Sequence, residues 1–182
     1  MDQATLDLLL AADGDHEAFA RLVTATESDV RRFCAWQTDA GSHLDDLVQE
    51  TFLRAFRGAH TYRSTAPARS WLLSVARRVC LDHADQLRRE HVRTERVATV
   101  ATDFSTPADP ILPPDLRELI LRLPLPFRNA FVLVAVIGHT YDDAASILGC
   151  PRGTVQSRVA RARRLLADAL ADGNAIADPA AS

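Results

Sequence analysis

The sequence predicts an all-α protein with two small helical domains joined by a flexible linker. Apolar residues recur every three or four positions through most of the chain, and no segment alternates as a half-buried strand would. This helical period is lost before residues 107–114, which contain four prolines. A helix-turn-helix pattern occupies residues 140–166. Together these observations predict the fold class.

Composition narrows the class of protein. The chain has 182 residues, of which 47% are hydrophobic and 25% charged, as in a folded chain of one domain or two small ones. No apolar run has membrane-spanning length and the N-terminus lacks the basic start of a signal peptide, so we expect a cytoplasmic protein without membrane insertion.

Cys34, Cys80 and Cys150 are widely spaced and have no histidine ligands beside them. We therefore expect small buried or half-buried residues, not a metal site or disulfides.

Charge is distributed unevenly along the chain. The net charge is −3, but residues 1–50 carry 11 acidic residues and 3 arginines (3 − 11 = −8). Residues 51–100 carry 10 arginines and 4 acidic residues (10 − 4 = +6). One surface is therefore expected to bind a basic partner and another a polyanion.

The helical pattern predicts the elements in order. The first domain, residues 1–90, contains helices at 3–12, 15–37, 43–58 and 70–90. Its apolar segment 6–12 belongs either to the core, which we favour, or to a partner surface. A linker follows at 91–114. The second domain, residues 115–171, contains helices at 115–122, 126–137, 141–148 and 152–171, and residues 172–182 are expected to be a disordered tail.

The helix at 43–58 has two distinct faces. One face is apolar and predicted to be buried: Leu44, Leu47, Val48, Thr51, Phe52 and Ala55. The other is polar around a single leucine: Asp46, Gln49, Glu50, Leu53 and Arg57. Leu53 is either an apolar anchor within a polar rim or an ordinary exposed leucine, and this helix alone does not decide between them.

The helix near Trp71 is predicted to carry arginines outward. Its core positions are Leu72, Val75, Ala76, Val79 and His83, and its outward positions are Ser74, Arg77, Arg78, Leu81 and Arg88. Arginine side chains in this arrangement suit a phosphate backbone. Trp71 itself is expected to be a core anchor rather than a stacking platform.

The segment from Thr140 to Leu166 predicts a DNA-reading helix-turn-helix. Thr140 can cap the first helix, Gly149 suits the left-handed residue that ends it, and Pro151 can open the next one. The second helix has a core face: Val155, Val159, Ala162 and Leu166. Its opposite face suits the major groove: Gln156, Ser157, Ala160, Arg161 and Arg164. The alternative is a solvated charged face. Arg158 lies at the flank and is interpreted as structural.

Several of these segments resemble one family. Residues 45–56, Asp-Asp-Leu-Val-Gln-Glu-Thr-Phe-Leu-Arg-Ala-Phe, resemble the core-polymerase-binding helix of bacterial sigma factors. Residues 71–77 and Asp82 resemble the promoter-recognition helix that follows it. The second domain is similar through Leu123-Pro124, Phe131 and residues 141–166. The chain is identified as resembling the extracytoplasmic-function (ECF) sigma factors, the minimal two-domain class.

The resemblance implies a function and partners. Such a factor binds core RNA polymerase and directs promoter-specific transcription initiation. It reads the minus-35 and minus-10 elements and captures the melted non-template strand. The implied partners are the β′ clamp helices and the β flap of the polymerase, promoter DNA and an anti-sigma factor. The linker would follow the RNA-exit channel, although a plain spacer would have the same composition.

The resemblance also implies site residues. Those for core polymerase are Asp45, Asp46, Gln49, Glu50 and Leu53. Those for the minus-10 element are His60, Tyr62, Arg63, Ser74, Arg77 and Arg78, with the loop at 58–70 either holding a flipped base or acting as an ordinary polar loop. Those for the minus-35 element are Arg152, Gln156, Ser157, Ala160, Arg161 and Arg164. Arg78 replaces a common asparagine and Gln156 a common basic residue, so the promoter preference is expected to differ.

Two other classes of function are weighed against this one. A repressor or response-regulator output module would share the helix-turn-helix but would not need the acidic helix at 43–58. An enzyme would need converging nucleophile, base or metal ligands, whereas the six histidines are scattered. We therefore expect no catalytic residues, no metal and no cofactor.

Overall fold

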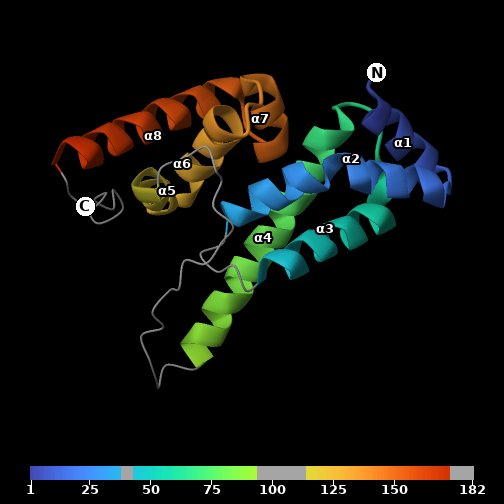
Figure 1. Cartoon of the computed structure of the whole chain (residues 1–182), viewed down its shortest axis with the longest axis horizontal. Helices are drawn as coiled ribbons and strands as arrows, with labels where there is room; N and C mark the ends of the chain where they lie inside the picture. The colour runs from blue at the N-terminus through green and yellow to red at the C-terminus, as the bar shows by residue number, and fades with distance from the viewer. Residues whose placement is uncertain (38–42, 94–113, 173–182) are drawn as a thin grey trace. The chain divides into compact units, whose positions relative to one another are not determined.

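The computed structural model describes residues 1–37, 43–93 and 114–172, and these residues contain helices and no strand. They form two compact units, divided between Thr106 and Pro107 (Figure 1). The all-α class with two small helical domains is thereby confirmed. No helix in these ranges combines the length and apolar character needed to cross a membrane.

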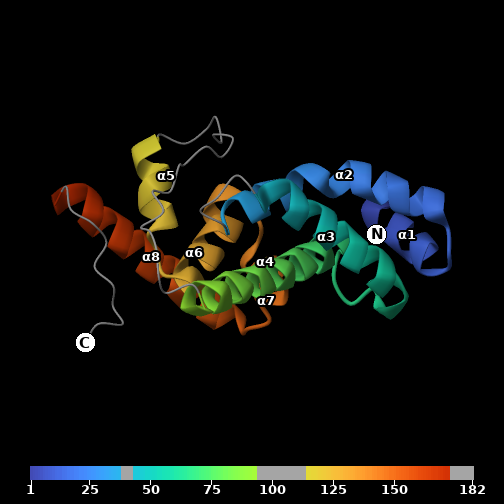
Figure 2. The same ribbon diagram turned by 90° about the horizontal axis from the view of Figure 1, so that it is seen from below.

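The described residues of the first unit form four α-helices and a short 3-10 turn. The helices are α1 (Gln3–Ala12), α2 (His16–Ala35), α3 (Leu44–Gly58) and α4 (Ala68–Arg93), with the turn η2 (Ala59–Thr61) between the last two. Helix α2 contacts α1, α3 and α4, and α3 also packs on α4 (Figure 2). The core between them holds fully buried side chains: Leu8, Leu22, Val30, Phe33, Leu72 and Leu73. Cys34 and Cys80 meet in this core with their Sγ atoms 3.7 Å apart.

Helix α4 is longer than the sequence pattern predicts. It continues through Arg93, so the first three residues assigned to the linker, 91–93, are helical. Side-chain pairs on the turns that precede these residues support this part of the helix in water. Arg88 donates to Asp85 at 3.3 Å and Gln86 to Glu90 at 3.0 Å. The rest of the predicted linker and the predicted tail beyond residue 172 lie outside the described residues.

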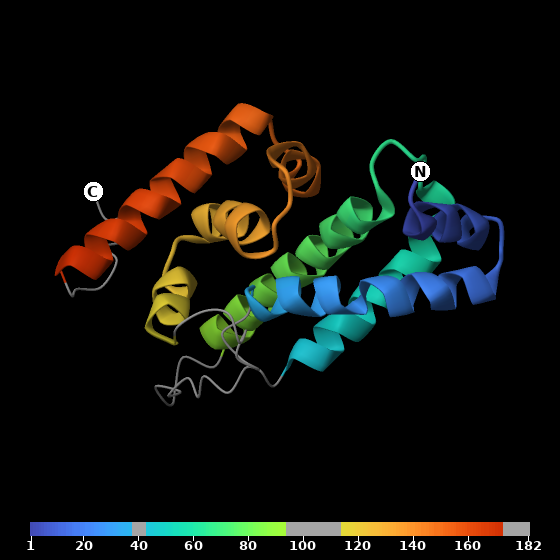
Figure 3. The ribbon, with the colours of Figure 1, turned by 45° about the horizontal axis from the view of Figure 1, so that its top comes forward.

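The second unit is built around one long helix. It contains α5 (Pro114–Leu121), α6 (Leu125–Phe131), the π-helical segment η3 (Val132–Val136), α7 (Tyr141–Leu148) and α8 (Arg152–Asp172). Helix α8 packs against α6 and α7 (Figure 3). Their shared core holds Ile120, Leu123, Leu133, Ile147 and Val155.

The predicted helix at 126–137 is not a uniform α-helix. From Val132 the backbone widens into π-helix, and the N–H of Ile137 donates to the carbonyl of Val132 at 2.8 Å. Valine is β-branched and has low α-helical propensity, so Val132, Val134 and Val136 oppose regular continuation of the helix.

Candidate protein and nucleic-acid interfaces

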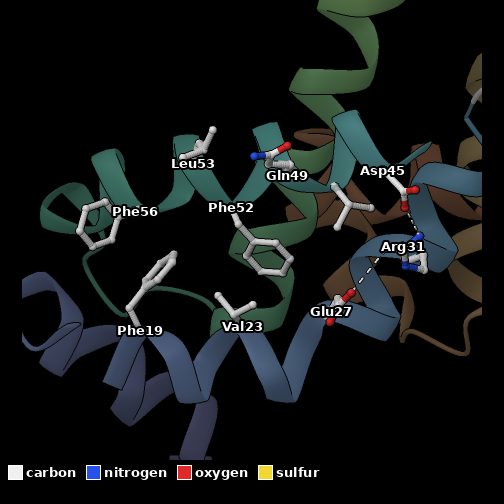
Figure 4. A pocket seen from close by; sticks show the side chains of 10 residues that line it. Phe19, Val23, Glu27, Arg31, Asp45, Gln49, Phe52, Leu53 and Phe56 are labelled. Atoms are coloured by element: carbon white, nitrogen blue, oxygen red, sulfur yellow. Dashed lines mark hydrogen bonds and ion pairs between the residues drawn. The ribbon is translucent and has the colours of Figure 1, made fainter. Parts of the chain in front are cut away.

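An apolar groove runs between α2 and α3 on the first unit. Its α2 wall is formed by Phe19, Val23, Glu27 and Arg31, and its α3 wall by Asp45, Val48, Gln49, Phe52, Leu53 and Phe56. Figure 4 shows Phe19 and Val23 facing Phe52 and Phe56 across it. The two helices pair because their amphipathic faces bury the core beneath the groove, which leaves these side chains at its rim and floor.

One end of the groove is aromatic and open to solvent. Leu53 is 41% exposed and Phe56 is 44% exposed. The Phe56 ring contacts those of Phe19 and His16 edge to face, with centroids 5.0 and 5.4 Å away. Large apolar side chains gathered in this way typically mark a docking surface, whereas a single exposed leucine does not.

The other end of the groove is charged. Arg31 donates to Asp45 at 2.6 Å and lies 3.5 Å from Glu27 (Figure 4). The hydrogen bond with Asp45 raises the pKa of Arg31 above its ordinary value. The carboxylate of Asp45 is therefore already paired within the unit, and a basic partner would have to share it or displace Arg31.

The five residues assigned to polymerase binding line two hollows, one on each side of α3. Asp45, Gln49 and Leu53 line the groove beside α2. Asp46 and Glu50 line a second hollow, between α3 and α4. There Arg54 donates to Glu50 at 2.7 Å and also bonds Asp82 of α4. The sequence pattern missed the α2 wall altogether.

The segment entering α4 is held together by local hydrogen bonds. The hydroxyl of Tyr62 donates to the carbonyl of Ala66 at 2.5 Å, and its ring packs edge-on against Trp71 at 5.6 Å. Tyr62 is only 5% exposed, so its ring lies against the unit rather than facing solvent. His60 and Arg63 are exposed, and Arg63 donates to the carbonyl of His60 at 2.8 Å.

The outward face of α4 is less uniform than predicted. Arg78 is exposed, as expected, but Ser74 and Arg77 are half-buried. The hydroxyl of Ser74 donates to the carbonyl of Trp71 at 2.6 Å, within its own helix. The Nε atom of Arg77 is buried and has no hydrogen-bond partner among the described residues. Trp71 is half-buried, which is intermediate between the burial of a core anchor and the exposure of a stacking platform.

The helix-turn-helix forms as its local signals predict. The Thr140 side chain accepts from the N–H of Asp143 at 3.1 Å. Gly149 has φ 63° in the left-handed region, and the carbonyl of Pro151 accepts from the N–H of Thr154 at 2.9 Å. The buried face of α8 contains Val155, Val159, Ala162 and Leu166, as expected.

The opposite face of α8 is open to solvent. Its exposed residues are Arg152, Gln156, Ser157, Ala160, Arg161 and Arg164. Arg152 is already paired with Asp142 of α7 at 3.2 Å. Arg158 is half-buried and directed at the Sγ atom of Cys150 at 3.7 Å, which agrees with a structural role. Within the described ranges, no three His, Cys, Asp or Glu side chains are grouped to hold a metal ion.

Comparisons with known proteins match both units. The Sigma-70 region 2 model matches residues 16–90 and the Sigma-70 region 4 model matches residues 114–166. The chain is 42% identical over 176 residues to the ECF RNA polymerase sigma factor SigC of Mycobacterium tuberculosis, covering 94% of each chain.

Solved structures agree with these sequence matches. The sigma factor RpoE from Bartonella quintana, crystallised with the anti-sigma factor NepR, is 26% identical with a TM-score of 0.72 and covers 84% of this chain and 96% of that one. CnrH, solved with the cytosolic domain of CnrY, is 23% identical with a TM-score of 0.70, covering 96% and 100%, and supports the fold alone.

Proposed function

This chain belongs to the ECF sigma factors, and we propose that its exposed surfaces divide the steps of initiation between α3, α4 and α8. Sigma factors are DNA-binding initiation factors and not enzymes. The chain therefore acts in promoter-specific transcription initiation with RNA polymerase. The assignments that follow concern which of its residues perform each step.

The groove between α2 and α3 is proposed to bind the β′ clamp helices of core polymerase. Leu53 and Phe56 offer exposed apolar area to an amphipathic helix, and Gln49 offers a polar contact beside them. Asp46 and Glu50 lie on the neighbouring face, where acidic groups would guide a basic partner and set its register. Asp45 contributes less because Arg31 already pairs with it.

The loop before α4 and the first turns of α4 are proposed to recognise the minus-10 element. Removing a base from the stack costs a few kcal/mol, which stacking and polar contacts must offset. His60 and Arg63 are exposed and available for these contacts, while Tyr62 supports the loop from beneath. On α4, Arg78 is the exposed cation for the strand backbone, with Ser74 and Arg77 at the edge of the same surface.

Helix α8 is proposed to lie in the major groove at the minus-35 element. Arg161 and Arg164 suit guanine or phosphate, Gln156 suits adenine, and the small Ala160 permits close approach. Ser157 and Arg152 complete the surface, although Arg152 is shared with Asp142. The affinity of α8 alone can be low, because polymerase bound to the first unit raises its effective concentration near DNA.

The domain and partner assignments follow from the same family. We assign residues 1–90 to sigma domain 2, 91–114 to a linker and 115–171 to sigma domain 4, with residues 91–93 extending the last helix of domain 2. We also propose contact of domain 4 with the β flap, action in the cytoplasm, and control by an anti-sigma factor. The structure of RpoE with NepR supports this last assignment, because that similar protein binds such an inhibitor.

One observation supports the proposal that separate surfaces bind polymerase and DNA: an exposed apolar groove occurs in the same chain as an arginine-bearing helix-turn-helix. A repressor would need only the second. The test is run-off transcription with core polymerase and a promoter containing both elements. The chain should confer specific initiation, and Arg161→Ala should reduce it about fivefold, for a lost contact of about 1 kcal/mol. Arg163→Ala, on the flank of α8, is the matched control. Blocked transcription, or equal activity of both variants, would contradict the assignment.

A further inference from the structure

Helix α1 supplies a hydrogen bond to the first residue of α4. The N–H of Ala68 donates to the Oγ1 atom of Thr5 at 3.1 Å, across 63 positions of sequence. Both residues are buried, and Thr5 is only 6% exposed. Figure 1 shows α1 beside the segment that leads from α3 into α4, and α1 contacts both η2 and α4.

The start of α4 uses an acceptor from elsewhere in the chain. The first N–H groups of any helix have no partner within that helix, and a side chain just before it usually accepts one of them. Here the preceding residue is Pro67, whose ring has no acceptor. The Thr5 hydroxyl accepts the first of these N–H groups, so this contact at the start of α4 is tertiary.

Thr5 is itself held in place. Its N–H donates to the Oδ1 atom of Asp2 at 2.8 Å, which caps α1. Hydrogen bonds from Thr5 hold the pKa of Asp2 below its ordinary value, and the charge of Arg69 lowers it further. A connected path therefore runs from the Asp2 carboxylate through Thr5 to the first turn of α4.

A second contact fixes the next residue of α4. Arg69 donates to Asp29 of α2 at 2.7 Å, with a longer contact of 3.5 Å to the carbonyl of Ala25. The first two residues of α4 are thus tied to two different helices. The loop at 59–67 is built on this turn, because Tyr62 packs against Trp71.

We propose that Thr5 is a positioning residue for minus-10 recognition, its hydroxyl fixing the first turn of α4 and thereby the loop at 59–67. The inference rests on the minus-10 role proposed above for that loop. Helix α1 precedes the segment matched by the region 2 model, which begins at residue 16. Without the hydroxyl, the Ala68 N–H is buried and unpaired, so the first turn frays and the loop loses its register.

The position of the loop matters at one step of initiation. Docking on polymerase uses the groove between α2 and α3, which Thr5 does not line. Holding a base outside the stack needs the loop in a single conformation, since an ordering cost would otherwise be added to the cost of extraction. Loss of the cap should therefore weaken open-complex formation and leave core binding unchanged.

The test compares Thr5→Val, which keeps the shape of the side chain and removes its hydroxyl, with Thr5→Ser, which keeps the hydroxyl. Thr26→Val is the matched control, because Thr26 is also buried but its hydroxyl donates to the carbonyl of Leu22 in its own helix. Three quantities are measured for each full-length variant: hydrogen exchange of the Ala68 amide, affinity for core polymerase, and open-complex formation on promoters with consensus or single-base-substituted minus-10 elements.

We expect Thr5→Val to speed exchange at Ala68 and to lower open-complex formation on the consensus promoter about fivefold, the usual effect of a lost cap. Its discrimination between consensus and substituted promoters should fall, while Thr5→Ser and Thr26→Val remain within about twofold of the parent. Core affinity should not change. Unchanged exchange at Ala68, or faster exchange with intact minus-10 discrimination, would overturn the positioning role, as would equal losses in core binding and open-complex formation.

A separate variant distinguishes failure of the inference from failure of the function beneath it. The double variant His60→Ala/Arg63→Ala removes two exposed side chains of the loop without touching the contact between Thr5 and Ala68. Loss of minus-10 discrimination in this variant, with a normal Thr5→Val, would overturn the positioning role alone. Intact discrimination in the double variant would overturn the proposed role of the loop and the inference with it.

Discussion

The binding energy available at Leu53 can be worked out from its exposure. Fully burying a leucine side chain contributes roughly 1.5–3 kcal/mol. Because Leu53 is 41% exposed, only that share of its area remains to be covered by a partner. Truncation in Leu53→Ala should therefore cost about 1 kcal/mol of binding, which is about a fivefold increase in Kd for core polymerase. Leu53→Asp should exceed tenfold, since it also places an unpaired charge in an apolar contact.

The assay is competition of unlabelled variants with the labelled parent chain for core polymerase, read by fluorescence anisotropy. Leu87→Ala is the matched control, because Leu87 is 44% exposed but lies on α4, away from the groove. Both substitutions remove a partly exposed leucine from a helix, so their effects on folding should be similar. If Leu53→Ala and Leu87→Ala compete equally well, the groove is not the polymerase contact and the reasoning from exposed area is wrong.

Further predictions concern backbone geometry and titration. Gly149→Ala should destabilise the second unit by about 1 kcal/mol because φ is 63° at this position. Gly153→Ala should stabilise the unit slightly, because the added Cβ on α8 meets no atom within 4 Å. Thermal unfolding of both variants checks this, and equal shifts in the unfolding temperature would contradict it. Cys80 should resist alkylation at pH 8 in the native fold, because its contact with the thiol of Cys34 and its burial raise its pKa. The half-buried Cys150 should react faster. Mass spectrometry measures both alkylation rates, and equal labelling of the two cysteines would refute the prediction. Burial and the neighbouring imidazole of His43 lower the pKa of His83 below 6.5. The contribution of His83 to the free energy of unfolding should therefore be present above pH 6.5 and lost as the pH falls through its folded-state pKa. His83→Gln should flatten this part of the plot of unfolding free energy against pH, and an unchanged plot would exclude the effect.

The helix-turn-helix could be predicted almost residue by residue because every step has a local signal. A threonine caps α7, a glycine ends it in the left-handed region, and the period of 3.6 residues divides α8 into buried and exposed faces. Each of these signals acts within four residues of its effect. The core positions Val155, Val159 and Ala162 followed directly from that period.

The groove and the cap of α4 could not be predicted in the same way, because both depend on contacts between distant segments. The pattern of α3 identified Leu53 as an exposed apolar residue, but nothing near it in sequence indicates that Phe19 and Val23 form the facing wall. Likewise, Thr5 looks like an ordinary first-turn residue of α1, and its bond to Ala68 follows from tertiary packing. The burial of Tyr62 also follows from tertiary packing, since its partner Trp71 comes from the next helix.

The surfaces proposed for polymerase and for the minus-10 element lie on adjacent helices, so their relative geometry depends on how α3 and α4 are joined. Arg54 links Glu50 of α3 to Asp82 of α4, and these hydrogen bonds, led by that with Asp82, raise its pKa. All three groups are exposed enough for water and salt to screen them, and exposed pairs typically contribute under about 1 kcal/mol. The buried contacts beneath them are worth more, since burying each leucine of the core contributes roughly 1.5–3 kcal/mol. The buried core therefore fixes the position of α3 relative to α4. Arg54 mainly neutralises part of the negative charge that α3 presents to a basic partner.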